Sequence, residues 1–138
     1  MFLKIIVDNQ IYLFYSRPTE TNQRQKKMYA DKLLRIEKYR KLVARLNKEY
    51  QDRMGFTHLE DQTIEFSIGK RFARIYFASF GEPRSVHSFV DIESGDIIKG
   101  SWKSPIRDKS GKLAVRGNIN ADDVGESSID HNGTKYLR

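Results

Sequence analysis

The stretch from Ser85 to Trp102, SVHSFVDIESGDIIKGSW, decides the predicted fold. Residues 86–91 alternate between side chains suited to the two faces of a strand, and a Glu-Ser-Gly-Asp turn follows at residues 93–96. A second strand then begins at Ile97 and ends on the only tryptophan of the chain. The stretch therefore predicts an antiparallel hairpin.

Two further strands precede this hairpin. Ile64, Phe66 and Ile68 alternate with polar residues, and a turn at Gly69-Lys70 leads into RFARIYFASF. The break at residues 81–84, Gly-Glu-Pro-Arg, separates this strand from the hairpin. We expect a four-stranded antiparallel meander over residues 63–102.

Residues 21–54 change to a helical period. Their apolar side chains recur every three or four positions, at Tyr29, Leu33, Ile36, Tyr39, Val43, Leu46, Tyr50 and Met54. Pro18, Thr19 and Thr21 supply start signals, and Gly55 with Phe56 supplies a C-cap and its apolar contact. The pattern predicts one amphipathic helix roughly 50 Å long, of which one end would project or pair with another copy.

The two ends of the chain complete an α+β fold in a single domain of residues 1–138. Residues 1–15 carry two apolar runs around a turn-prone trio, Asp8-Asn9-Gln10, which predicts an N-terminal hairpin buried against something larger. Residues 103–138 predict a basic surface loop and a polar tail whose end only Tyr136 and Leu137 would anchor.

The composition argues against an enzyme. The chain has no cysteine, and its three histidines, His58, His87 and His131, have no metal-ligand spacing, so no metal or cofactor is predicted. Asp91, Glu93 and Asp96 flank a tight turn, where solvated carboxylates are common. No nucleophile motif or phosphate loop is present.

The net charge of +7 is concentrated in one segment, because residues 20–54 carry eleven basic and five acidic residues. Such asymmetry suggests a polyanionic partner. No apolar run resembles a signal peptide or a membrane helix, so we expect a cytoplasmic protein that does not bind membranes.

The candidate site combines rings with cations on one face of the predicted meander. In the strand from Arg71 to Phe80, Ala73, Ile75 and Phe77 would pack under the helix, while Phe72, Arg74 and Tyr76 would face outward and continue into His87 and Phe89. The predicted phosphate contacts are Arg71, Arg74, Lys99, Lys103, Arg107, Lys112 and Arg116, and the predicted stacking residues are Phe72, Tyr76, Phe89 and Trp102.

Each of these surfaces has a plainer interpretation. The aromatic residues would equally form a second core layer under the N-terminal hairpin. The basic helix face would be a solvated surface; its members are Lys26, Lys27, Arg35, Lys38, Lys41, Arg45 and Lys48.

Residues 85–138 resemble a recurring segment of small, mostly uncharacterised phage-encoded proteins. The matching pieces are SVHSFVDIESGDIIKGSWKSP, residues 116–119 (RGNI) and the ending from Gly133 to Arg138. The resemblance implies a virus-encoded protein of the infected host cytoplasm, used in genome replication or in handling single-stranded DNA. It implies no catalytic residue.

Two functions remain open from the sequence. The first is sequence-independent binding of single-stranded nucleic acid, with DNA as the expected polymer. The second is a phage structural or interaction protein that docks on a host protein or forms a homo-oligomer through the long helix, with only incidental affinity for nucleic acid.

Overall fold

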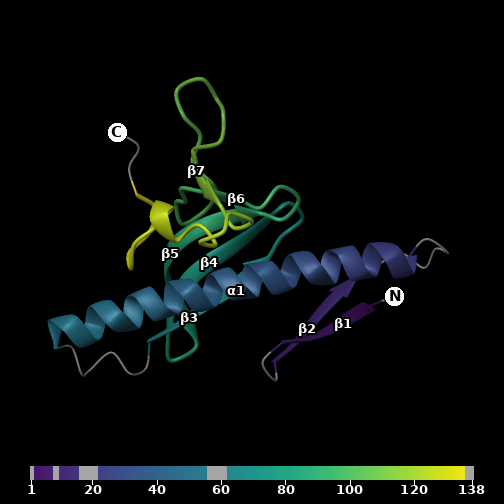
Figure 1. Ribbon diagram of the computed structural model, residues 1–138, viewed down its shortest axis with the longest axis horizontal. Coiled ribbons are helices and arrows are strands. Elements are labelled where there is room, and N and C mark those ends of the chain that lie inside the picture. The colour runs from purple at the N-terminus through teal and green to yellow at the C-terminus, as the bar shows by residue number, and fades with distance from the viewer. Residues whose placement is uncertain (1, 8–9, 16–21, 56–61, 136–138) are drawn as a thin grey trace.

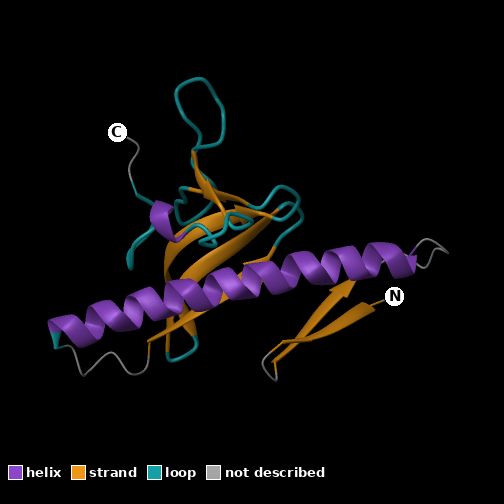
Figure 2. Ribbon diagram, in the orientation of Figure 1, coloured by secondary structure: helices purple, strands orange, loops and turns teal. Residues whose placement is uncertain are grey.

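The computed structural model describes residues 2–7, 10–15, 22–55 and 62–135, with side-chain contacts from residue 26 onward. It is an α+β fold, in which a long helix crosses a curled antiparallel sheet (Figures 1 and 2). Among the described residues, no helix has the length and apolar character needed to cross a membrane.

Helix α1 spans Asn22–Met54, close to its predicted bounds. Gly55 ends it in the left-handed conformation, with φ of 72°, and its N–H donates to the carbonyl of Asp52, which confirms the predicted cap. The predicted start signals and the contact of Phe56 lie outside the described residues. At about 1.5 Å per residue, α1 is roughly 50 Å long, and it extends beyond the sheet (Figure 1).

The N-terminal hairpin forms a sheet of its own. Strands β1 (Phe2–Val7) and β2 (Gln10–Tyr15) pair antiparallel, as predicted. The two strands lie along the N-terminal half of α1 and away from the main sheet (Figure 1). The core-layer interpretation required this hairpin to cover the outer face of the main sheet. The position of the two strands along α1 contradicts that interpretation.

The main sheet has five strands, one more than the predicted meander, in the order β3-β4-β5-β6-β7. The strands are β3 (Gln62–Ile68), β4 (Phe72–Ser79), β5 (Glu82–Asp91), β6 (Asp96–Ile98) and β7 (Val115–Asn118). The break between β4 and β5 is a tight turn at Phe80-Gly81, both with positive φ, so residues 82–84 belong to β5. The prediction of a sheet limited to residues 63–102 was therefore wrong at the edge beside β6, where β7 adds a fifth strand.

The core lies between α1 and one face of this sheet. Ala73, Ile75 and Phe77 of β4 face the helix, as the alternation predicted. The other buried apolar members are Leu33, Ile36, Tyr39, Val43, Ile64, Val90, Ile92, Ile97, Ile119 and Ile129. The side chains of residues 2–25 are outside the described part of the structure and are not assigned to the core.

The C-terminal segment is anchored more firmly than the sequence indicated. Ile119 and Ile129 are buried in the core, and β7 pairs with β6. A short 3-10 helix, η1 (Glu126–Ser128), lies between Ile119 and Ile129 in the sequence and contacts β7. Ile119 and Ile129 were not predicted as anchors, since isolated isoleucines in a polar segment carry no period. The end of the segment was predicted to be anchored by Tyr136 and Leu137. Those two residues lie outside the described part of the chain.

Candidate nucleic-acid interface

The outer face of the sheet, opposite α1, carries a cluster of rings and arginines. Residues of one face meet across strands, and the register places Arg74 of β4 opposite Phe89 of β5. The guanidinium carbon of Arg74 lies 5.6 Å from the Phe89 ring centroid and 5.7 Å from that of Trp102. Arg71 lies 4.9 Å from the Phe72 ring centroid, and the Phe72 and Phe89 rings meet edge to face at 6.4 Å. Of the predicted outward face, Phe72, Arg74 and Phe89 therefore belong to one connected cluster.

The loop after β6 covers part of this cluster. Gly100 lies so close to Phe89 that an added Cβ would come within 2.6 Å of the ring, and Phe89 is only 4% exposed. A turn from Ser101 to Ser104 carries Trp102 outward, with its side chain 47% exposed. Phe89 therefore supports the site from below, and its predicted role as a stacking platform was wrong.

A depression of about 440 Å³, the sheet groove, lies beside these rings. Its cationic members are Lys70, Arg71, Arg74 and Lys103, and the rest of its lining is Ser67, Ile68, Gly69, Phe72, Phe89 and Pro105. One of these cations is paired with an acid: Asp91 Oδ2 accepts a hydrogen bond from Arg71 Nε at 3.3 Å. Four cations against one paired carboxylate make the groove suited to an anion.

Asp91 offsets only one of the four cations, and it also shapes the backbone beside the groove. Its Oδ1 accepts hydrogen bonds from the backbone N–H groups of Glu93 and Ser94, so the carboxylate closes the turn between β5 and β6. Glu93 forms an ion pair with Lys32 of α1. Among the described residues, no group of three or more acids or histidines could hold a metal ion.

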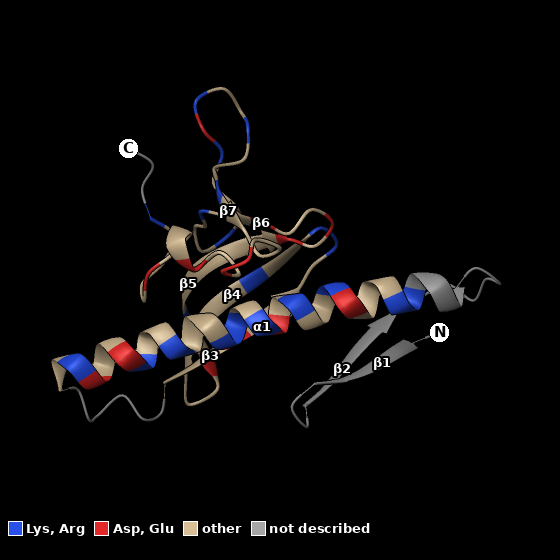
Figure 3. Ribbon diagram, viewed as in Figure 1, with Lys and Arg blue, Asp and Glu red and all other residues tan. Residues whose placement is uncertain are grey.

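The remaining predicted contacts divide between this surface and others. Tyr76 is half-buried and donates to Glu65 Oε2 at 3.4 Å, and burial together with this carboxylate raises its pKa. Lys99 lines a different pocket, and Arg116 is half-buried on β7 with a buried Nε that has no hydrogen-bond partner among the residues that the structure describes. Arg107 and Lys112 lie on a loop that projects from the sheet (Figure 3). Lys70 and Pro105 were missed, although Lys70 sits in the predicted turn beside Arg71.

His87 does not belong to the outer face. A β-bulge shifts the pairing of β4 with β5 between Ile75 and Tyr76. The centroid of the His87 ring lies 6.4 Å from that of Tyr39 and 6.0 Å from that of Phe77, on the helix side of the sheet. The strict alternation that placed His87 outward fails here, because a bulge inserts one extra residue into the strand.

His87 instead holds the C-terminal segment in a fixed hydrogen-bond chain. Its Nε2 lies 2.9 Å from the carbonyl of Asp130, which can only accept, so Nε2 carries the proton. Ser88 Oγ, at 2.9 Å, then donates to Nδ1 and accepts from Tyr39 Oη at 2.7 Å. Burial lowers the pKa of His87 and raises that of Tyr39 well above its ordinary value. Both ring nitrogens of His87 are therefore engaged.

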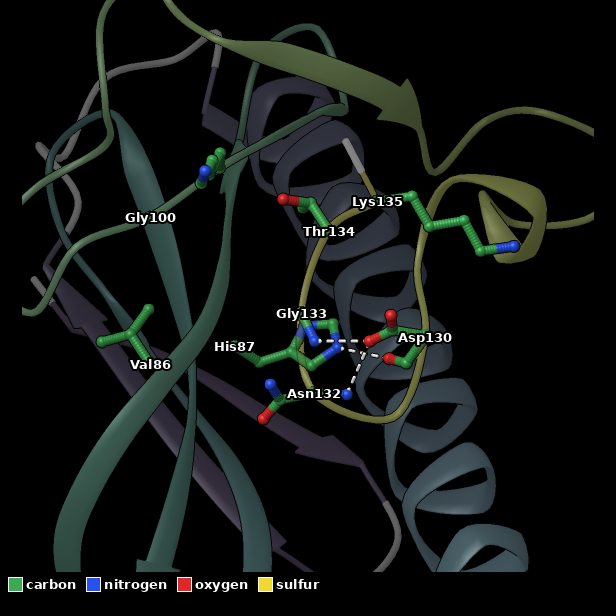
Figure 4. Close-up of a pocket in the computed structure, with 9 residues that line it drawn as sticks. Val86, His87, Gly100, Asp130, Asn132, Gly133, Thr134 and Lys135 are labelled. Carbon is green, nitrogen blue, oxygen red and sulfur yellow. Dashed lines mark hydrogen bonds between the residues drawn. The ribbon is translucent and has the colours of Figure 1, made fainter. Parts of the chain in front are cut away.

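This histidine forms one wall of a second pocket of about 500 Å³ (Figure 4). The segment from Asp130 to Lys135 faces Val86 and Gly100 across it, and the Lys135 side chain points away from His87. Asp130 Oδ1 accepts the backbone N–H groups of Asn132 and Gly133. The polar atoms here stabilise the fold of the segment.

Arg35 and Arg45 of the basic helix face, and Lys32 elsewhere on α1, are used inside the molecule. Arg45 pairs with Glu126 of η1, Arg35 donates to Asn120, and Lys32 pairs with Glu93. Arg40 instead makes a two-pronged pair with Glu37, which is 2% exposed, and donates to the carbonyl of Ile64. Several helix cations therefore dock the polar turns of the sheet, which reduces the charge available to a partner.

Fold and surface together define an α+β protein with a basic, ring-lined groove on the open face of an antiparallel sheet. Residues 19–136 match the model of a family of unknown function, DUF7717, and the chain belongs to that family. The match begins after the N-terminal hairpin and covers α1 and the whole main sheet. No curated protein and no solved structure matches the chain.

Proposed function

We propose that this protein binds single-stranded nucleic acid without sequence preference, on the outer face of the main sheet. The observation that carries the proposal is the exposed ring of Trp102 next to Arg74, which is one of the four cations that line the sheet groove. Single strands bind where flat rings accept bases and cations follow the phosphates. Trp102 and the cations of the adjoining sheet groove supply both kinds of group.

The buried position of Phe89 assigns distinct roles to the rings. Arg74 already occupies one side of Trp102, so a base would stack on the opposite, exposed side. Phe72 is half-buried and would contribute an edge, while Lys70, Arg71 and Lys103 would contact phosphates. The preference for DNA and the phage origin remain predictions from the resemblance of residues 85–138.

Titration with oligothymidylate tests the proposal directly. Trp102 is the only tryptophan, so its fluorescence should be quenched on binding, and affinity should fall steeply as salt rises. Absence of binding at low salt would overturn the proposal. Binding without any change at Trp102 would also contradict it, since it would indicate attraction to the helix cations or to general charge.

An interaction protein is the competing outcome. If helix α1 mediates assembly, sedimentation of the free protein would show concentration-dependent oligomers, and the oligonucleotide would bind weakly with unchanged Trp102 emission. A monomer that binds oligothymidylate through Trp102 would exclude this outcome.

A further inference from the structure

A second depression continues the sheet groove toward the projecting loop. This loop groove has a volume of about 510 Å³ and is lined by Phe72, Ser101, Ser104, Pro105, Ile106, Arg107 and Leu113. Phe72 and Pro105 line both depressions. The two grooves therefore adjoin, and together they run from the turn between β3 and β4 to the start of the projecting loop.

The projecting loop, residues 106–113, is held together by hydrogen bonds within it. Arg107 bridges to Leu113 across it, and the backbone N–H of Asp108 donates to the carbonyl of Lys112 at 2.7 Å. Asp108 Oδ1 accepts from the backbone of Ser110 and Lys112 and from the Ser110 hydroxyl, and these bonds lower the pKa of Asp108. The one acid of the loop is therefore used to shape it.

Three cations remain on this loop: Arg107, Lys109 and Lys112. All three are exposed, and none forms an ion pair with any residue that the structure describes. Figure 3 shows that the loop before β7, which carries them, projects beyond the body of the sheet. The helix cations differ, because several of them pair with acids of the sheet turns and of η1.

We propose that the site is bipartite, and that a single strand seated in the sheet groove continues past Phe72 and Pro105 through the loop groove to place phosphates on Lys109 and Lys112. This inference rests on the proposed function and adds the path of the strand and a length requirement. The second contact becomes intramolecular once the first is made, so affinity rises when a strand is long enough to reach both parts.

The experiment compares oligothymidylates of about 2 to about 20 nucleotides, a range that includes the about 4 to 16 nucleotides that a small single-strand-binding domain occupies. Binding is measured by fluorescence anisotropy for the wild-type protein, for Lys109→Ala/Lys112→Ala and for the matched control Lys38→Ala/Lys48→Ala. The control removes the same charge from exposed positions on α1. The altered loop lysines are exposed and contribute no described side-chain hydrogen bond, so folding should be retained, and circular dichroism checks it.

Wild-type affinity should rise by about tenfold or more at a threshold length. The loop variant should bind the shortest strands as the wild type does and lose the gain at the threshold. Its salt dependence with long strands should also weaken, by a slope of about 0.7 for each lost phosphate contact, so by about 1.4 in total. The helix variant should keep both the threshold and the slope.

Two results would overturn the bipartite site while leaving the proposed function intact. One is affinity that increases smoothly with length and equally in the loop variant and the wild type. The other is an equal loss in the loop and helix variants, which would indicate general charge attraction. Failure of every oligonucleotide to bind at low salt would instead refute the proposed function, and the bipartite site with it.

Discussion

The guanidinium of Arg74 lies between two rings of opposite exposure, the buried Phe89 and the exposed Trp102, with centroid distances of 5.6 and 5.7 Å. Its Nε is buried without a hydrogen-bond partner among the described residues. Cation–π attraction between the guanidinium and the two rings offsets part of the cost of this missing hydrogen bond and is worth about 0.5 to 2 kcal/mol. Arg74 thus positions the ring on which the proposed function depends.

Replacing this exposed ring should weaken binding without unfolding the protein. Trp102→Ala should lower the affinity for oligothymidylate by about 1 to 3 kcal/mol, because one base loses its stacking surface. The measurement is fluorescence anisotropy of a labelled oligonucleotide. The matched control is Phe80→Ala, since Phe80 is 78% exposed and lies in the turn at the opposite end of β4 from Phe72. Similar losses in both variants would contradict the assigned role of Trp102.

Protonation of His87 should destabilise the fold. Its folded-state pKa lies below the ordinary 6.5 because of burial, so the unfolded chain binds the proton first as the pH falls. Stability from this group is therefore present above about pH 6.5 and is lost as the pH falls from there toward the folded-state pKa, by at most about 1.4 kcal/mol per pH unit. Urea unfolding from about pH 7.5 to about pH 5.5 measures it.

The variant His87→Gln should lose this pH dependence of the unfolding free energy. Comparison with the wild type therefore isolates the contribution of His87 from those of the neighbouring charged groups, which are Asp130, His131, Lys99 and Lys135. If His87→Gln does not fold, an NMR titration of the wild-type imidazole gives the pKa directly. A value at or above 6.5 would refute the prediction.

Gly95 should be far less replaceable than Gly111, although both have positive φ, of 79° and 85°. A Cβ at Gly95 would lie 2.6 Å from the side-chain amide nitrogen of Asn120 and 3.1 Å from Ile119, whereas nothing lies within 4 Å at Gly111. Gly111→Ala should cost about 1 kcal/mol for backbone strain alone, and Gly95→Ala should cost a further 1 to 3 kcal/mol for overpacking. Equal costs in chemical denaturation would contradict this.

The pair between Glu37 and Arg40 should matter more than the surface pairs on the same helix. Glu37 is 2% exposed and accepts two hydrogen bonds from the half-buried guanidinium of Arg40, at 2.6 and 2.7 Å, and Glu37→Ala removes both charge-assisted bonds. We expect a loss of roughly 3 kcal/mol in unfolding free energy. Glu49→Ala, which removes an exposed partner of Arg45, should cost under about 0.5 kcal/mol. A similar cost in both variants would refute the prediction.

Local pattern was sufficient for the elements that repeat a period. The helical spacing of Leu33, Ile36, Tyr39 and Val43 indicated α1 and its buried face, and the alternation of Ala73, Ile75 and Phe77 indicated which side of β4 packs under it. Strand β7 was missed because VRGN has no apolar alternation and is a strand only through its pairing with β6.

The sequence by itself determined the α+β class, the hairpins, the long helix and the group of rings and cations that gathers around β4, because these depend on periods and turn residues close together in the chain. Only the tertiary structure decided which of those groups a partner can reach. A bulge turned His87 inward, the close approach of Gly100 buried Phe89, and Glu93 and Glu126 engaged helix cations. Exposure and pairing depend on residues distant in sequence, so no local pattern specifies them.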